Sequence, residues 1–130
     1  MSTFALRVVT PDGEKFSGDV EKIFFRASDG DVGIMANHAD YIAAVDICRV
    51  RIATSEGELK AVCGGGFITF SKNSASLVCD TFVFSSDINE AEVHSQLDST
   101  REKLENAKNP REKTILESQL KRLKLQADIV

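Results

Sequence analysis

One histidine and one cysteine are the side chains best suited to covalent chemistry in this sequence. Cys63 could act as a nucleophile, because the glycine run 64–66 that follows it could supply backbone donors for an oxyanion. His38 would then be the general base, with Asp40 or Asp46 as the acid that orients it. A small thiol hydrolase is therefore one candidate function.

Such a trio can be chosen from almost any chain of this size, since a catalytic site requires geometry and not composition alone. The favoured interpretation of His38 is a loop residue that makes one hydrogen bond or one interface contact. The glycine run lacks the Lys-Ser/Thr of a phosphate-binding loop and is followed by the strand-like residues 67–70. It therefore predicts a tight bend or a close approach of two backbones.

No cofactor or metal site is expected from the spacing of the possible ligands. The three cysteines, Cys48, Cys63 and Cys79, form no C-x-x-C pair, and the two histidines are far apart in the sequence. Because three cysteines cannot all pair and each lies in an apolar run, we expect buried thiols in a reducing compartment.

Composition excludes several classes of protein. The chain is 42% hydrophobic and 28% charged, which is typical of a soluble globular protein of one domain, or of one small domain with an appendage. Its net charge of −4 argues against nucleic-acid binding, which needs clustered cations. No apolar run approaches the ~20 residues of a membrane span, and no signal peptide is visible at the N-terminus. We therefore expect a cytosolic, bacterial-type protein without direct membrane insertion.

The elements that would position these side chains change character near residue 86. Up to Phe84 the apolar period is two, and turn signals such as Pro11-Asp12-Gly13 separate short runs, which predicts a β-sandwich or barrel. The predicted strands cover residues 4–9, 20–27, 44–53, 59–63, 67–70 and 76–84. The expected fold class is mainly β followed by α, with an N-terminal β-sandwich.

After residue 86 the apolar period becomes helical. Asp87 and Glu90 predict a capping box at the start of a first helix. Asn109 and Pro110 end that helix and begin a second one, as N-cap and first helical residue. The two apolar stripes consist of residues 93, 97, 100, 104 and 107, and of residues 116, 120, 123 and 127. Two helices joined so closely must run antiparallel, as a C-terminal helical hairpin.

The hairpin has narrow apolar stripes, so it needs a surface to lie on. The acidic surplus of the chain lies before Ile88, whereas positive and negative charges balance in residues 88–130. Lys121, Arg122 and Lys124 form a basic cluster near the C-terminus. Such a cluster is usually a solvated helix face, but an acidic partner surface is a second possibility.

Three ordered motifs resemble the epsilon subunit of bacterial F-type ATP synthase, and the resemblance covers nearly the whole chain. Residues 30–39, GDVGIMANHA, are similar to the family's Gly-Glu-x-Gly-x-x-Pro-Gly-His-Ala. Gly65-Gly66-Phe67 and, after a strand, residues 78–81, VCDT, are similar to the family's Gly-Gly-Phe/Ile and Leu-Ala-Asp-Thr. Residues 87–91, DINEA, lie close to the family's motif at the start of the hairpin.

The resemblance implies a non-catalytic rotor subunit at the cytoplasmic face of the bacterial cell membrane, as a peripheral protein. Residues 1–86 would bind the gamma subunit and the c-ring. Residues 87–130 would be regulatory, extending towards the alpha and beta subunits and restraining ATP hydrolysis. By this resemblance Asp29 and Asp31 would face the ring loops and His38 would face gamma, while Lys121, Arg122 and Lys124 would make the regulatory contacts.

Some members of this family hold ATP against the folded hairpin with an Ile/Leu-Asp-x-x-Arg-Ala motif. Here Ile88 matches the motif, but Asn89 replaces Asp, Glu92 replaces Arg and Val93 replaces Ala. The Arg-to-Glu difference puts an anion where a phosphate would need a cation. We therefore expect no ATP binding by the isolated subunit.

Overall fold

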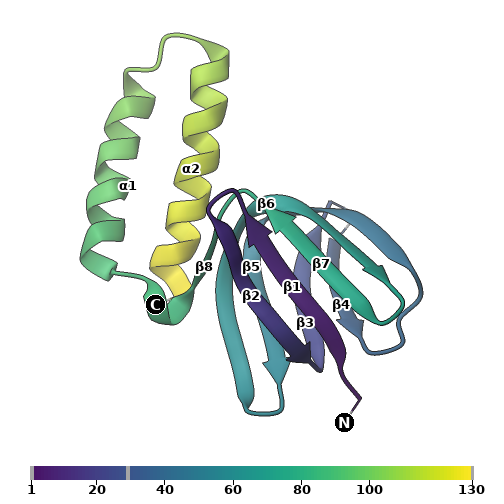
Figure 1. Ribbon diagram of the computed structural model, residues 1–130. Helices are drawn as coiled ribbons and strands as arrows, with labels where there is room; N and C mark the ends of the chain where they lie inside the picture. Colours follow the sequence, from purple (N-terminus) through teal and green to yellow (C-terminus); the bar gives the residue numbers. More distant parts are fainter. Residues whose placement is uncertain (1, 29, 130) are drawn as a thin grey trace.

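Eight strands, a short 3-10 helix and two α-helices make up the computed structural model, which describes residues 2–28 and 30–129 (Figure 1). The strands are β1 (Phe4–Thr10), β2 (Gly13–Val20), β3 (Lys22–Ala27), β4 (Gly30–Met35), β5 (Tyr41–Thr54), β6 (Gly57–Ser71), β7 (Ser74–Cys79) and β8 (Phe82–Phe84). The 3-10 helix is Ser85–Asp87, and the helices are α1 (Glu90–Glu105) and α2 (Pro110–Ile129). The predicted order of β followed by α is confirmed.

The strands follow the order β2-β1-β7-β6-β5-β3-β4, with β8 also paired to β6. Only β1 and β7 pair in parallel among the described strands. The long strands β5 and β6 belong to both layers of the sandwich. The second half of β6 pairs with β7 and its first half with β8, while the second half of β5 pairs with β3. Side chains such as Leu6, Val50, Ile68 and Leu77 are fully buried between the layers.

The glycine run 64–66 allows two backbones to meet, as the sequence predicted. The chain between β7 and β8 crosses β6 there, and the Gly64 N–H donates to the Thr81 carbonyl at 2.8 Å. The Asp80 N–H donates to the Gly65 carbonyl at 2.9 Å. A Cβ on Gly66 would lie only 2.6 Å from the Cα of Cys79. Strand β6 therefore runs continuously through residues that the sequence analysis had placed between two separate strands.

Two further strand predictions were wrong. Strands β2 and β4 were not predicted. Strand β2 buries only Val20 fully and shows no alternation, and β4 alternates but buries only Ile34 fully. Residues 76–84 were predicted as one strand but divide into β7 and β8 at Asp80 and Thr81. An edge strand with one exposed face and few contacts lacks the apolar signal on which the prediction depends.

The helical hairpin has the predicted apolar stripes and one different cap. Asn109 caps α2 as expected, with its side-chain oxygen accepting from the Glu112 N–H at 2.8 Å. The N-cap of α1 is Asn89, which accepts from the Glu92 N–H at 3.1 Å, and not Asp87, which belongs to the 3-10 helix. The capping-box prediction was thus wrong by two residues.

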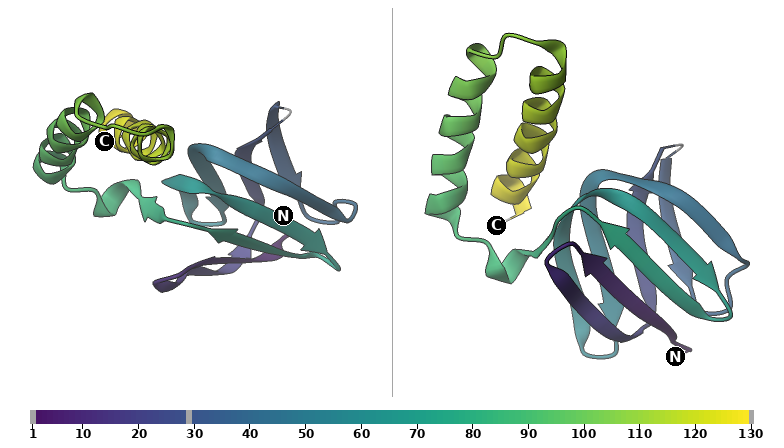
Figure 2. Two further views of the ribbon diagram at one scale, coloured as in Figure 1. Left: turned by 90° about the horizontal axis from the view of Figure 1, so that it is seen from above. Right: turned by 45° about the horizontal axis from the view of Figure 1, so that its top comes forward.

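The hairpin and the sandwich have separate apolar cores. Val93 and Leu97 of α1 pack with Leu123 of α2, and half-buried Leu120 and Ala127 complete this cluster. In the views of Figures 1 and 2, α2 lies next to the sandwich and α1 lies on the far side of α2. The hairpin therefore has its own packing and touches the sandwich along one helix. Across residues 2–28 and 30–129, neither helix combines the length and apolar character that a membrane span requires.

Candidate partner-binding surfaces

The thiol hydrolase alternative is excluded by the distance between its two essential residues. The ring of His38 packs edge-on against Tyr41 and Phe70, with centroid separations of 5.8 Å in both cases. Cys63 lies seven residues before Phe70 on β6, which corresponds to roughly 20 Å along a strand. His38 is an exposed loop residue whose Nδ1 lies 2.7 Å from the Ala39 carbonyl oxygen, so the prediction of a loop residue with one hydrogen bond is confirmed.

The three cysteines are buried, free thiols, as expected. Cys48 on β5 lies directly opposite Cys63 on β6. Burial raises the pKa of Cys48 from its ordinary value of 9.0 to about 11. The hydrogen bond with Cys79, together with burial, raises the pKa of Cys63. A thiol with a raised pKa carries little thiolate at neutral pH and is a poor nucleophile and metal ligand. Within the described residues no group of side chains is arranged to hold a metal ion.

The residues assigned to the rotor contact lie at two separate ends of β4. Asp29 lies outside the described residues. Asp31 lies near the start of β4, opposite Arg26 of β3, and these side chains form an exposed ion pair of 3.9 Å. His38 lies beyond the other end of β4: about 13 Å of strand separates Asp31 from Met35, and the Met35 carbonyl accepts from the His38 N–H at 3.2 Å. Asp31 and His38 therefore lie near opposite ends of β4.

The loop that carries His38 is fixed by one asparagine of a neighbouring turn. The side-chain oxygen of Asn73 accepts from the Asn37 N–H at 2.9 Å, while its side-chain nitrogen donates to the Thr3 carbonyl at 2.9 Å. Asn37 has a positive φ of 65°, a conformation that asparagine tolerates better than most residues. These bonds hold the His38 loop against the N-terminal end of β1.

An exposed apolar row, not predicted from the sequence, crosses four strands on the outer face of the sandwich. Val9 of β1 lies opposite Val78 of β7, Val78 opposite Phe67 of β6, and Phe67 opposite Ala44 of β5. Directly opposed residues in a sheet point to the same face. Ile42, two residues before Ala44, is on that face too. Exposed fractions of 74% for Ile42, 45% for Phe67 and 38% for Val78 make this an unusual surface for a soluble domain.

We call these five residues, 9, 42, 44, 67 and 78, the apolar row. Each of them lies within or beside a run that the sequence predicted as a strand or a turn. The apolar row can be identified only when the register of the four strands is known. Residues 9 and 78, for example, become neighbours through the parallel pairing of β1 with β7. An alternation of apolar and polar residues along one strand does not reveal it.

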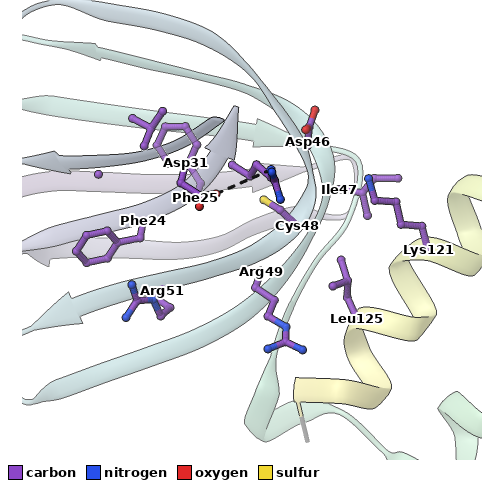
Figure 3. Close-up of a pocket in the computed structure, with 13 residues that line it drawn as sticks. Phe24, Phe25, Asp31, Asp46, Ile47, Cys48, Arg49, Arg51, Lys121 and Leu125 are labelled. Atoms are coloured by element: carbon purple, nitrogen blue, oxygen red, sulfur yellow. Dashed lines mark ion pairs between the residues drawn. The ribbon is translucent and has the colours of Figure 1, made fainter. Parts of the chain in front are cut away.

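The basic cluster of α2 does not act as a single exposed patch in this conformation. Lys121 lines a groove of about 790 Å³ between α2 and the sandwich, together with Leu125 of the same helix (Figure 3). Arg122 is half-buried and lines a smaller cavity of about 260 Å³, with Ile47 and Asp80 on the sandwich side. Lys124 is exposed. Lys121 and Lys124 are therefore both exposed, Lys121 at the edge of the groove, whereas Arg122 is partly enclosed between α2 and the sandwich.

Two polar atoms near the junction between hairpin and sandwich are buried without a hydrogen-bond partner among the described residues. They are Nε of Arg122 and Oγ1 of Thr81. Gly64 lies in contact with Thr81 and also lines the cavity beside Arg122. An unsatisfied buried polar atom costs about 1–3 kcal/mol. The Arg122 side chain is therefore enclosed beside a cavity at the junction of α2 with the sandwich and has no protein hydrogen-bond partner for its Nε among the described residues.

The residues of the degenerate ATP motif have structural roles at the start of α1. Ile88 packs half-buried against the hairpin cluster, and Val93 is buried within it. The side-chain oxygen of Asn89 is engaged as the N-cap of α1. Glu92 is exposed in the first turn of the helix. None of these four residues carries a positive charge that could pair with a phosphate.

Comparisons with known proteins agree in sequence and in fold. The model of the β-sandwich domain of the ATP synthase delta/epsilon chain matches residues 3–85. An ATP synthase epsilon chain of Ruminiclostridium cellulolyticum is 35% identical over 127 residues, covering 95% of this chain and 95% of its own length. The epsilon chain of Pediococcus pentosaceus is 38% identical over 95 residues, covering 72% of this chain and 68% of its own.

A solved structure has the same fold. A chain in the cryo-EM structure of the Euglena gracilis mitochondrial ATP synthase superposes with a TM-score of 0.77 at 16% identity. The superposition covers 96% of this chain and 79% of that one. Sandwich and hairpin thus occur together in both. On the evidence of the domain match and the near full-length similarity, this chain belongs to the ATP synthase epsilon-chain family.

Proposed function

We propose that this protein is a non-catalytic subunit of the central rotor stalk of F-type ATP synthase. The sandwich, residues 1–86, binds the gamma subunit and the c-ring and so helps to couple ion flow through the ring to ATP synthesis. The hairpin, residues 87–130, is the regulatory part and restrains ATP hydrolysis by contacts with the alpha and beta subunits. The complex holds the protein at the cytoplasmic face of the bacterial cell membrane. Membership of the epsilon-chain family supports this assignment.

The observation that carries the proposal is the apolar row. Fully burying a large apolar side chain contributes about 1.5–3 kcal/mol, so covering Ile42, Phe67 and Val78 would supply a substantial part of the affinity for a partner. The row lies on a rigid sheet face, which needs little reordering on binding. We assign it to the gamma subunit, with His38 at the neighbouring end of the sandwich and Asp31 directed to the loops of the c-ring.

The row can be tested by co-purification with the gamma subunit. Changing Ile42 and Phe67 together to Ser should weaken binding at least tenfold, because both side chains lose apolar area at the centre of the surface. Ile115→Ser is the matched control, since Ile115 is 51% exposed on α2 and lies outside the row. Equal binding by the double variant and the control would contradict the assignment, provided that both variants unfold in urea at the midpoint of the original protein.

The regulatory role of the hairpin is supported by its separate apolar core and by the enclosed Arg122 side chain at its junction with the sandwich. An element that moves between two positions must have packings that differ by only a few kcal/mol. The hairpin can keep its own cluster around Val93, Leu97 and Leu123 while α2 leaves the sandwich. Release would also let water reach the unsatisfied Nε of Arg122. The test is ATP hydrolysis by the reconstituted catalytic head with the full chain and with a chain that lacks residues 88–130.

ATP is not proposed as a ligand of the isolated subunit. Asn89 is engaged as a helix cap, Val93 is buried, and Glu92 would repel a phosphate. Movement of the hairpin would therefore respond to rotor torque or to the state of the catalytic subunits.

A further inference from the structure

A groove of about 790 Å³ lies between α2 and the sheet face formed by β3, β4 and β5. We propose that this groove binds an extended acidic segment of a partner protein while the hairpin is docked. The effect of such binding on regulation rests on the proposed function, whereas the binding itself does not.

Cations dominate the lining of the groove in a protein whose net charge is −4. Arg26 comes from β3, Arg49 and Arg51 come from β5, and Lys121 comes from α2. The lining contains two carboxylates, those of Asp31 and Asp46. The lining itself thus holds four cations and two carboxylates, while Glu58 and Asp128 lie just outside it beside Arg51 and Arg49. An anionic occupant would replace these long, exposed pairs with closer ones.

The arginines of β5 are held in place but are not strongly paired. The guanidinium of Arg51 lies 4.6 Å from the centroid of the Phe24 ring, a cation–π contact that fixes its position. Arg51 lies 3.8 Å from Glu58 and Arg49 lies 3.9 Å from Asp128, and both distances exceed that of a hydrogen bond. Their N–H groups can thus donate shorter, bidentate hydrogen bonds to the oxygens of a new carboxylate.

The spacing of these cations matches an extended peptide. Arg49 and Arg51 are alternate residues of one strand, so their side chains leave the same face about 7 Å apart. Carboxylates at alternate positions of an extended segment have the same repeat. A volume of about 790 Å³ also far exceeds that of a single oxyanion, and Phe24 and Leu125 provide apolar surface between the charges (Figure 3).

The groove exists only when both of its walls are present. Lys121 and Leu125 belong to α2, whereas Arg49, Arg51 and Phe24 belong to the sandwich. A ligand that touches both walls binds the docked form and stabilises it by mass action. An acidic segment in the groove would therefore oppose extension of the hairpin and would use Lys121, which is then unavailable for contacts with the catalytic head.

The test uses the full chain and a labelled probe peptide of three glutamate-leucine repeats with blocked ends. Fluorescence anisotropy should give saturable binding that weakens as salt rises, and NMR should map the largest shifts to Gly33 and Leu125, which line the groove. The double variant with Arg49→Gln and Arg51→Gln should bind at least tenfold more weakly, and Lys121→Gln about threefold more weakly. A double variant with Arg111→Gln and Lys113→Gln is the matched control, because these exposed cations lie at the start of α2, outside the groove lining.

Several results would overturn the proposal. They are no saturable binding below 1 mM peptide, largest shifts outside the groove, equal loss of affinity in the control variant, or displacement of the peptide by an equal concentration of inorganic phosphate. Equally tight binding of a peptide of three lysine-leucine repeats would also overturn the proposal. Because binding is measured on the isolated chain, its failure is distinct from any failure of the hairpin to restrain ATP hydrolysis.

Discussion

Arg49 on β5 and Asp128 near the end of α2 form an ion pair of 3.9 Å that joins the sandwich to the hairpin. Among the described residues it is the one ion pair that crosses between these two parts, since the others lie within the sandwich or within α1. Both side chains are largely exposed, at 51% and 68%. An exposed pair contributes about 0.2–1 kcal/mol and is screened by salt. Docking of the hairpin should therefore be weak and easily shifted.

Asp128→Asn should reduce the ratio of docked to released hairpin up to about fivefold, the upper limit for such a pair. Energy transfer between dyes on Ser55→Cys in the β5–β6 turn and Ser99→Cys on α1 would report the distance. Asp98→Asn is the control, because it removes an exposed ion pair inside α1. The same fall in transfer for both variants would contradict a specific role of the Arg49–Asp128 pair.

Asp31→Arg should weaken assembly with the rotor or the coupling of ion flow, while the isolated protein keeps its stability. The side chain is 88% exposed, so its loss costs little in the fold, but the new cation would repel basic ring loops and the neighbouring Arg26. Co-purification and ion pumping at low salt provide the measurement. Asp12→Arg, in the β1–β2 turn, is the control, because it makes the same change of charge away from Asp31. Unchanged rotor binding and pumping would argue against the ring-facing role of Asp31.

Changing Lys121, Arg122 and Lys124 together to Ala should relieve the restraint on ATP hydrolysis without unfolding the sandwich. The extended hairpin would lose the cations that contact an acidic surface of a beta subunit. The difference in hydrolysis rate between the variant and the original chain should shrink at high salt. The steady-state hydrolysis rate of the reconstituted head is the readout. A triple Ala variant at Lys108, Arg111 and Lys113 removes the same charge near the turn between the helices. If both triple variants restrain hydrolysis as strongly as the original chain, the hairpin is only a brace.

Calorimetry of the isolated protein with millimolar Mg-ATP should give no saturable heat. The N-terminal end of α1 offers Glu92 where a phosphate would need a cation, and the cap made by Asn89 is already engaged. The arginines of the hairpin, Arg101, Arg111 and Arg122, lie at least nine residues beyond Glu92 in the sequence. Saturable binding in the micromolar range would overturn this prediction.

The buried thiol of Cys48 should make the protein less stable at high pH. Its pKa is raised to about 11 in the folded state, so the folded protein holds a proton that the unfolded chain releases near pH 9. The contribution of Cys48 to the free energy of unfolding is complete below pH 9 and is lost as the pH rises towards 11. Urea denaturation at pH 8, 9.5 and 11 measures this fall, which should be smaller in Cys48→Ala. An identical fall in that variant would assign the effect to other groups.

Local patterns in the sequence predicted most of the fold. The cap made by Asn109, the apolar stripes of both helices and the close backbone contact at residues 64–66 all follow from neighbours in the sequence. Strands β2 and β4 could not be predicted, because their stability comes from pairing and not from their own burial. The apolar row could not be predicted either, since it depends on the register of strands far apart in the chain. The groove needs the position of α2 on the sheet, which no local pattern specifies.

The parallel pairing of β1 with β7 also determines when the protein can fold during its synthesis. Ala5 is bonded in register with Ser74, so the first strand emerges from the ribosome long before its partner does. Until then β1 and β2 can form only an isolated hairpin, which is marginally stable in water. Contacts between such distant residues slow the closure of a domain. The nascent sandwich therefore stays open until β7 has been made, and the C-terminal helices are synthesised only after the sheet on which α2 docks has all its strands.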